Sequence, residues 1–157
     1  MLAAQLVQKL KDKQRTVTAA ESLTCGLFQA TLGDISGVSA IFPGGFVTYS
    51  AQLKEWLGVP ADIVQQFGTV SAECAKEMAL SAKKAASTDY AISFTGVAGP
   101  DLLEDKAVGT VWIGIATPCD VRTYLLQSSG TTRQAIRQEA VEYGMKCLLE
   151  VVNNSEE

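Results

Sequence analysis

Histidine is absent from this sequence of 157 residues. Its absence excludes Ser-His-Asp and Cys-His catalysis, zinc sites built on imidazole and the usual histidine proton shuttle. Any acid–base chemistry must therefore use lysine, tyrosine, cysteine or carboxylate groups. The sequence also lacks a run of about 18 apolar residues, and its first residues lack the basic region and apolar stretch of a signal peptide. We therefore expect neither a membrane span nor a membrane partner.

Cysteines are few and follow no metal-binding pattern. Cys25, Cys74, Cys119 and Cys147 form no C-x-x-C pair and no zinc spacing. This favours reduced, structural cysteines in a cytoplasmic protein without a metal. The 13 basic and 17 acidic residues give a net charge of −4, with a pI near 4.9. That balance argues against a nucleic-acid partner.

The length and composition predict one soluble domain covering residues 1–157, since 47% of the residues are hydrophobic and 19% are charged. Helical periodicity or capping residues predict helices over 2–13, 27–32, 51–57, 72–86 and 131–152, with a short helix opened by Pro60. Apolar or β-branched runs predict strands at 16–20, 46–49, 90–94, 110–116 and 121–127. This order predicts a three-layer α/β/α domain around a mixed, mostly parallel sheet of about five strands.

Two loops combine polar residues with glycines. Residues 20–26 join a strand to a helix whose first amides could bind an anion, although Ser22 or Thr24 could simply cap that helix. Residues 95–101 follow the central strand, beyond which ligands collect in open α/β sheets. A tight structural turn explains this second loop equally well. Neither loop matches the dinucleotide-binding or Walker pattern.

A third polar segment, residues 129–133, precedes the last helix. Arg133 falls in the first turn, where a cation costs about 0.3–1 kcal/mol unless an anion offsets it. It is therefore a candidate phosphate clamp, with Arg137 one turn further along. A solvated arginine is the alternative explanation.

The catalytic candidates are Ser39, Tyr49 and Lys54. Without histidine, a serine nucleophile can be activated by a lysine amine. The pKa of that lysine must fall by about 3 from its usual value near 10.4, which costs ~4 kcal/mol. Tyr49 ends a strand and Lys54 lies in the helix that follows, so both can point at one crevice. A turn serine, a core tyrosine and a solvated lysine are the structural alternatives.

Taken together, these segments resemble the CinA C-terminal domain family, the nicotinamide mononucleotide deamidases. The matching stretches span nearly the whole chain in order. They are Ala20–Gly26, Gly37–Ser39, Gly45–Ser50, Lys54 with Leu57–Val59, Gly68–Ser71, Thr95–Asp101, Val108–Val111 and Ser129–Arg137.

The resemblance implies a single CinA C-terminal-like amidohydrolase domain that acts in pyridine nucleotide salvage. It would hydrolyse the carboxamide of nicotinamide mononucleotide to nicotinic acid mononucleotide and ammonia. It implies Ser39 as nucleophile, Lys54 as base and Tyr49 as an assisting residue, with no cofactor and a homo-oligomeric assembly. The substrate-binding positions implied by the resemblance and by the loops above are Ser22, Thr24, Gly26, Thr95, Gly96, Gly99, Arg133 and Arg137.

The sequence departs from the family pattern at two loops. Cys25 stands where the family usually has glycine, and Leu102–Asp105 replaces a glycine-rich stretch. Ala107 replaces a usual proline. These departures leave two alternatives open: a nucleotide-binding regulatory or partner module without turnover, and an amidase for another small amide. The family also occurs fused to a larger domain, whose activities are not expected of this sequence.

Overall fold

A five-stranded sheet forms the centre of the computed structural model, which describes residues 1–155. The strands are β1 (Val17–Glu21), β2 (Phe46–Val47), β3 (Tyr90–Gly96), β4 (Thr110–Ala116) and β5 (Val121–Gln127). The helices are α1 (Leu2–Lys13), α2 (Leu27–Gly33), α3 (Ala51–Leu57), α4 (Ala61–Phe67), α5 (Ala72–Ala86) and α6 (Arg133–Asn154). A short 3₁₀ turn, η1 (Val38–Ala40), lies between α2 and β2.

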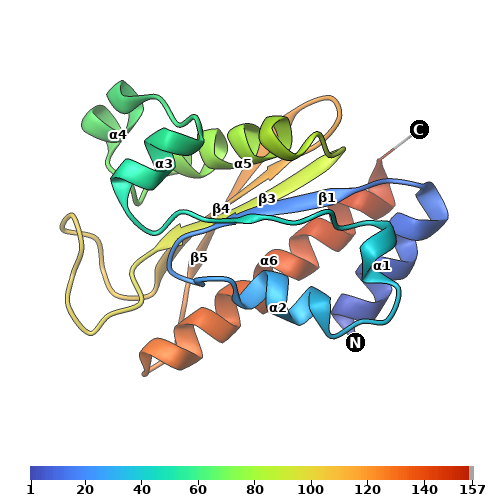
Figure 1. Cartoon of the computed structure of the whole chain (residues 1–157). Helices are drawn as coiled ribbons and strands as arrows, with labels where there is room; N and C mark the ends of the chain where they lie inside the picture. The colour runs from blue at the N-terminus through green and yellow to red at the C-terminus, as the bar shows by residue number, and fades with distance from the viewer. Residues whose placement is uncertain (156–157) are drawn as a thin grey trace.

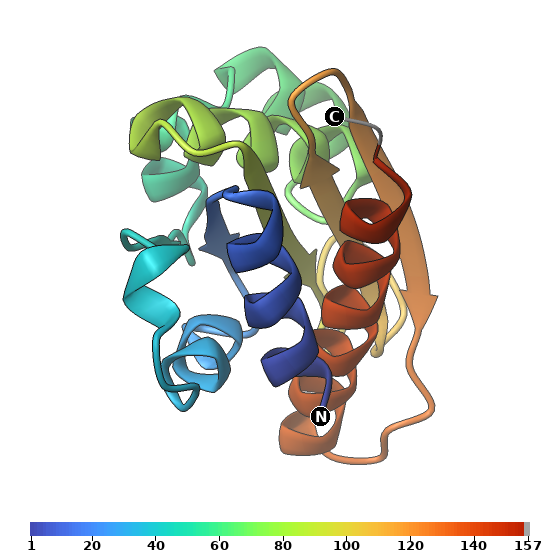
Figure 2. The same cartoon turned by 90° about the vertical axis from the view of Figure 1, so that its right-hand side faces the viewer.

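The helices cover both faces of the sheet. Helices α1, α2 and α6 pack on one face, and α3, α4 and α5 lie over the other (Figure 1). Figure 2 shows α1 and α6 running side by side within the first of these layers. The expected three-layer α/β/α architecture is confirmed.

The sheet is mixed, in the order β2-β1-β3-β4-β5. Strand β1 pairs in parallel with β2 and β3, whereas β3 pairs antiparallel with β4, and β4 with β5. The expectation of a mostly parallel sheet is therefore wrong. Parallel neighbours need a crossover connection, usually a helix. Residues 97–109 contain no helix, so the chain turns back and β4 runs opposite to β3.

The order in which strands are added to the sheet changes direction at β1. From β1 the chain crosses through α2 to β2 on one side, and then through α3, α4 and α5 to β3 on the other side. In open α/β sheets, ligands bind beyond the carboxyl ends of the strands at such a switch point. Ser22 directly follows β1, and its N–H donates to Phe94 O at 2.9 Å. Thr48 directly follows β2, and its N–H donates to Glu21 O at 2.9 Å.

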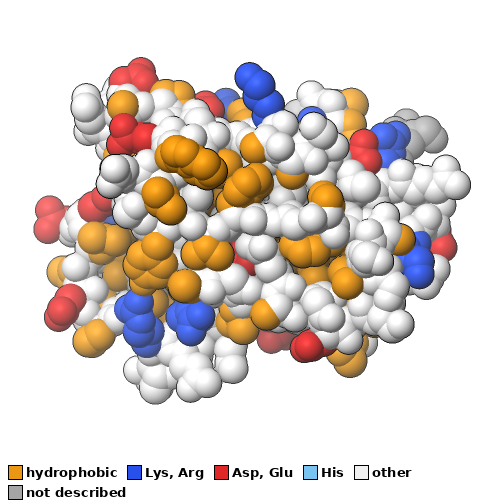
Figure 3. Space-filling model, in the orientation of Figure 1, with side chains coloured by type: hydrophobic (Ala, Val, Ile, Leu, Met, Phe, Trp, Pro, Cys, Tyr) orange, Lys and Arg blue, Asp and Glu red, His pale blue; other side chains and the backbone are white. Residues whose placement is uncertain are grey.

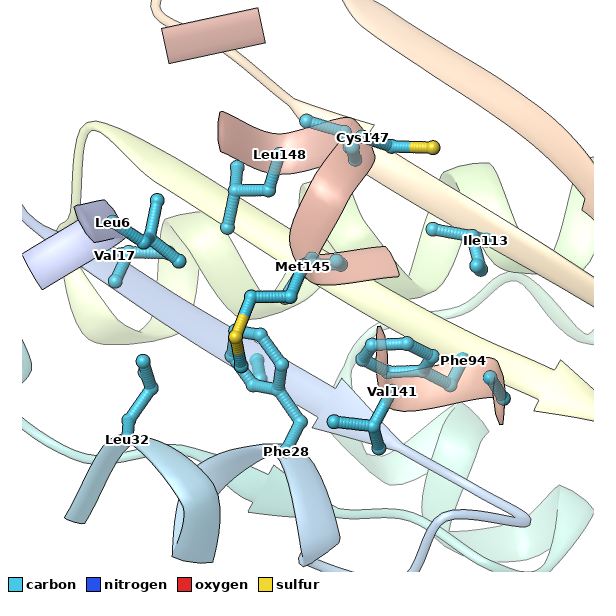
Figure 4. Close-up of a cluster of buried hydrophobic side chains, with 14 of the residues drawn as sticks. Leu6, Val17, Phe28, Leu32, Phe94, Ile113, Val141, Met145, Cys147 and Leu148 are labelled. Carbon is cyan, nitrogen blue, oxygen red and sulfur yellow. The ribbon is translucent and has the colours of Figure 1, made fainter. Parts of the chain in front are cut away.

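The larger core lies between the sheet and the layer of α1, α2 and α6 (Figure 4). Phe28 of α2 and Phe94 of β3 are fully buried, with ring centroids 5.5 Å apart. Val141 and Met145 of α6 belong to the same cluster. Full burial of a side chain of this size contributes roughly 1.5–3 kcal/mol. These contacts fix α2 and α6 against the carboxyl half of the sheet.

Helix α5 lies close to the opposite face because the residues between them are small. Ser71 caps this helix by accepting the Cys74 N–H at 3.1 Å. A Cβ added to Gly114 of β4 would lie 2.4 Å from Ala75 O of α5. Only glycine at that position permits this spacing between helix and sheet.

Two element boundaries differ from the sequence-based expectation. Helix α6 begins at Arg133 rather than at residue 131, and it is capped by Thr132, which accepts the Ala135 N–H at 3.0 Å. Strand β2 covers only Phe46–Val47 and not residues 46–49. Thr48 and Tyr49 leave the sheet, which brings their carbonyl groups to the Lys54 amine.

No helix within residues 1–155 is long and apolar enough to cross a membrane. Hydrophobic side chains gather on the surface over α3 and the segment before it (Figure 3), where Val47, Leu53 and Trp56 are exposed. Such side chains are compatible with self-association, and the expected homo-oligomer remains a prediction.

Candidate active site

A cavity of about 390 Å³ opens beyond the carboxyl ends of β1 and β3. Its polar side chains include Ser22 after β1, Lys54 of α3 and Arg133 of α6. The loop after β3 forms a further wall, and Figure 1 shows this loop projecting past the sheet on the side where α6 begins. The cavity therefore lies at the switch point of the sheet.

Lys54 is buried, with 1% of its surface exposed. Its helix is capped by Ser50, which accepts the Leu53 N–H at 3.0 Å, and its amine points inward to three oxygen atoms. Nζ lies 2.9 Å from Ser22 Oγ, 2.8 Å from Thr48 O and 2.9 Å from Tyr49 O. No carboxylate in residues 1–155 forms a salt bridge with this amine.

This environment favours the neutral amine. Burial lowers the pKa of Lys54 from its usual value, and the charges of Cys74 and Glu104 act in the opposite direction. Burial raises the pKa of the Cys74 thiol to about 11, so near neutrality the thiol is uncharged and only Glu104 opposes the shift. A neutral amine has two N–H donors for the two carbonyls and one lone pair for the Ser22 hydroxyl.

Ser22 is also largely buried, and its Oγ has a second neighbour, Tyr49 O, at 3.3 Å. When Lys54 is charged, the ammonium donates to Ser22 Oγ and the hydroxyl can donate to Tyr49 O. When Lys54 is neutral, the hydroxyl can donate to Nζ instead. The pair therefore has the geometry of a hydroxyl nucleophile beside its base.

Tyr49 and Arg133 form the outer polar edge of the cavity. Arg133 donates from Nη2 to Tyr49 Oη and from Nη1 to Gly99 O, both at 2.6 Å. Arg133 is exposed and makes no ion pair within the described residues. Its guanidinium therefore has charge available for an anionic ligand.

The predicted residues of the 95–101 loop, Thr95, Gly96 and Gly99, line the cavity. Thr95 Oγ1 donates to Thr69 O at 2.7 Å, which ties the end of β3 to the segment before α5. A Cβ on Gly96 would lie 2.5 Å from Thr110 O, and a Cβ on Gly99 would lie 2.6 Å from a methyl group of Val108. Both glycines are needed for close packing, so the structural alternative explains part of this loop.

Three predicted binding residues lie outside the cavity lining. Arg137 donates to Leu23 O and Thr24 O, each at 2.9 Å, and so fixes the loop that carries Ser22. Thr24 is buried, and its Oγ1 has no partner among the described residues. Gly26 adopts the left-handed backbone region (φ 92°) where α2 begins. In this structure these residues shape the loop rather than face the cavity.

The expectation that the first amides of α2 bind a substrate anion is wrong. Glu21 is completely buried, and its carboxylate accepts the N–H groups of Phe28 at 2.9 Å and Gln29 at 3.0 Å. The Glu21 carboxylate thus already occupies the N-terminus of α2, where a substrate anion was expected. Neither Ser22 nor Thr24 caps the helix.

The pairing of Ser39 with Lys54 is also wrong. Ser39 is an exposed residue of η1, outside the cavity. Two residues after Ser39, the carbonyl of Ile41 accepts the Val17 N–H at the start of β1. Ser22 follows the other end of that strand. Five residues of strand separate those two ends by about 16 Å. Ile41, two residues after Ser39, is buried, but at the opposite end of β1 from the cavity.

Ser22 was expected to bind substrate, and the structure places its hydroxyl beside the Lys54 amine. Its position directly after a buried strand at the switch point was a usable signal. Glu104 and Thr69 lie in segments that the comparison with the family pattern named, but neither residue was given a role, because their contact joins segments 35 residues apart. Within residues 1–155, no group of three or more cysteine, aspartate or glutamate side chains could hold a metal ion.

Comparison with known families gives a match to the CinA C-terminal domain over residues 1–152. The chain belongs to the CinA C-terminal domain family. The match covers every described strand and the cavity. The resemblance drawn from the sequence segments is thus confirmed.

Curated relatives of this CinA domain are described as competence-damage inducible proteins. One from Levilactobacillus brevis is 53% identical over 149 residues, which cover 94% of this chain and 36% of the relative. One from Streptococcus gordonii is 45% identical over 155 residues, covering 98% of this chain and 37% of the relative. The chain therefore spans just over a third of these relatives.

Solved structures of CinA superfamily proteins share the whole fold. A protein from Klebsiella pneumoniae has a TM-score of 0.95 at 29% identity, covering 98% of this chain and 97% of the other. A competence/damage inducible protein from Agrobacterium tumefaciens has a TM-score of 0.91 at 31% identity, covering 98% and 94%. These similarities support the α/β fold described above.

The two sequence departures of this CinA domain have a shared backbone feature. Cys25 (φ 50°), Glu104 (φ 54°) and Asp105 (φ 60°) all adopt the left-handed region that glycine occupies most readily. The loops therefore keep a glycine-like backbone while presenting side chains.

Proposed function

We propose that this CinA domain hydrolyses the carboxamide of nicotinamide mononucleotide to nicotinic acid mononucleotide and ammonia. Ser22 acts as the nucleophile and Lys54 as the general base and acid. Arg133 and Tyr49 hold the anionic part of the substrate at the cavity edge. No cofactor takes part in this scheme.

The observation that carries the proposal is the contact between Lys54 Nζ and Ser22 Oγ at 2.9 Å inside the cavity. A buried lysine without a carboxylate partner is costly, and such perturbed groups concentrate at functional sites. The chain has no histidine, so this pair supplies the nucleophile and base that amide hydrolysis needs.

In the first half-reaction, neutral Lys54 removes the hydroxyl proton of Ser22 as Oγ attacks the amide carbon. The C–O bond forms and the carbonyl electron pair moves to oxygen. When the tetrahedral intermediate collapses, the protonated Lys54 gives its proton to the departing nitrogen and the C–N bond breaks. Ammonia leaves, and an ester on Ser22 remains.

In the second half-reaction, a water molecule attacks the ester carbon while Lys54 accepts a proton from that water. The bond between the acyl carbon and Oγ then breaks, and Lys54 returns the proton to Ser22. The product is a carboxylic acid, which loses its proton to the solvent to become a carboxylate, and both residues regain their starting states. The same amine therefore serves as base and acid in each half.

The developing oxyanion needs hydrogen-bond donors. The backbone N–H groups of Leu23 and Ala98 belong to residues that line the cavity, and neither donates to another group within the described part of the chain. Leu23 directly follows the proposed nucleophile, a common position for an oxyanion donor. One such donor contributes about 3–4 kcal/mol in other enzymes.

The deciding experiment is incubation of the purified wild-type chain with nicotinamide mononucleotide, measuring ammonia and nicotinic acid mononucleotide together. We expect equal amounts of both products, and an unchanged rate after treatment with a chelator. Binding of the nucleotide without either product would support a regulatory module. Release of ammonia only from another member of a panel of pyridine and pyrimidine amides would support a different amidase.

Replacement of Arg133 by methionine should raise KM by about tenfold or more while changing kcat much less. The guanidinium would contact the remote anionic group, whose charge-assisted hydrogen bonds act equally in the ground and transition states. Steady-state kinetics of ammonia release measures both constants. Arg122→Met is the matched control, because Arg122 pairs with Asp120 outside the cavity. A loss confined to kcat would contradict this role.

A further inference from the structure

The loop after β3 forms a small hairpin at the mouth of the cavity. Leu103 and Lys106 form an isolated antiparallel bridge, and Glu104 and Asp105 make the turn between them. Leu102 is 64% exposed and Leu103 is 46% exposed, yet both line the cavity. Exposed leucines on a projecting hairpin keep a fixed place only if something anchors the tip.

Glu104 supplies that anchor. One carboxylate oxygen accepts the Val70 N–H at 3.0 Å, and the other accepts the Thr69 N–H at 2.9 Å and the Thr69 hydroxyl at 2.7 Å. Among residues 101–106, only Glu104 makes side-chain hydrogen bonds to another segment of the described chain. We call this set of three hydrogen bonds the Glu104 clasp.

The clasp connects directly to the catalytic end of the sheet. Thr69 and Val70 line the same cavity as Leu102 and Leu103. The carbonyl of Thr69 accepts the hydroxyl of Thr95 at 2.7 Å, so the clasp is continuous with the end of β3. Release of the carboxylate would therefore loosen two walls of the cavity at once.

We propose that Glu104 is a positioning residue that fixes Leu102 and Leu103 as an apolar wall for the flat heteroaromatic ring of the substrate. This inference rests on the proposed function. The polar groups of the cavity serve the amide and the anionic end, which leaves the ring for the apolar surface. A wall held in place binds the ring without first losing the freedom of a mobile loop.

Glu104 also has an electrostatic effect at Lys54. Its charge raises the pKa of the Lys54 amine, while Cys74 on α5 is uncharged near neutrality. Asp101 and Arg133, the other charged residues of the cavity lining, are unchanged by a substitution at Glu104. Removal of the Glu104 charge should therefore lower the Lys54 pKa.

Glu104→Gln tests the proposal, with Asp105→Asn as the matched control. A glutamine has one acceptor oxygen in place of two, so it loses the N–H of Thr69 or of Val70. We expect KM to rise about tenfold and kcat to stay within about threefold. The acidic limb of the kcat/KM profile should move to lower pH. Asp105 makes no side-chain hydrogen bond within the described residues, so Asp105→Asn should leave KM and the limb unchanged.

Leu103→Ala tests the apolar wall separately from the charge of Glu104. It should raise KM without moving the acidic limb, because the carboxylate stays in place. An unchanged KM for Glu104→Gln, or an equal rise in Asp105→Asn, would overturn the proposal.

Amide hydrogen exchange at Thr69 and Val70 tests the clasp without relying on turnover. These amides should exchange faster in Glu104→Gln than in the wild type and Asp105→Asn. If the wild type releases no ammonia, the proposed function is wrong, and hydrogen exchange alone decides on the clasp. Equal protection in all three chains would overturn it.

Discussion

Replacement of Ser22 by alanine should lower kcat for ammonia release by roughly a thousandfold or more, because the substrate then lacks its nucleophile. Binding of nicotinamide mononucleotide, measured by calorimetry, should change only a few-fold. Lys54 keeps its two carbonyl acceptors in this variant, so its local packing is retained. Mass spectrometry should detect an acyl adduct on the wild-type chain and none on Ser22→Ala.

Ser39→Ala is the matched control for this experiment. Ser39 is exposed in η1, at the opposite end of β1, so its loss should leave kcat and KM within about twofold of the wild type, as is usual for a surface substitution. If Ser39→Ala abolishes turnover while Ser22→Ala is active, the assignment of the nucleophile made here is wrong.

Lys54→Met should also abolish turnover, with a loss of roughly a thousandfold or more in kcat. Methionine has a similar length and fills the buried space of the Lys54 side chain, but it cannot accept the Ser22 proton or protonate the leaving nitrogen. The same assay measures the loss. A variant that retains more than about a tenth of the wild-type kcat would exclude Lys54 as the base.

The same variant tests the protonation state of Lys54 without any substrate. Because burial lowers the Lys54 pKa, the folded chain binds fewer protons than the unfolded chain between the folded pKa and the usual value of 10.5. The free energy of unfolding of the wild type therefore increases as pH rises through that interval. Below the interval Lys54 is charged in the folded chain, and the full cost of burying that charge lowers the stability. Lys54→Met lacks this dependence.

Urea denaturation from about pH 7 to about pH 10 measures the effect as a difference between the two chains. Cys74 contributes the opposite trend because its pKa is raised, and the Lys54 charge lowers that pKa, so the comparison is made with Cys74→Ala in both chains. The stability of the wild type relative to Lys54→Met should increase with pH. A constant difference would mean that Lys54 titrates in the folded chain as it does when unfolded.

The sequence was sufficient for the elements and their layering. Helix α1 follows from the spacing of Leu2, Leu6, Val7 and Leu10, of which the last three are buried, and α5 follows from the Ser71 cap. Strand direction was harder to predict. A loop of 13 residues, 97–109, is long enough to suggest a crossover, but nothing local in it specifies a helix, and the chain turns back.

The candidate site was predictable only in part. The crevice, Lys54, Tyr49 and Arg133 follow from their positions near strand ends and a helix start, and the structure brings them together. The partner of Lys54 did not follow, because Ser22 and Ser39 both flank apolar segments and only tertiary packing distinguishes the two ends of β1. Glu104 and Thr69 meet across 35 residues, and no periodic pattern predicts such a contact.

The buried carboxylate of Glu21 has a consequence for how a nucleotide can enter. Many α/β proteins receive a phosphate at the helix that follows the first strand, and here that place holds a negative charge belonging to the protein. On the proposed function, the phosphate would lie at the Arg133 guanidinium on the cavity edge and not at the start of α2. The proposed substrate would then enter end-on, with its uncharged amide leading and its phosphate trailing.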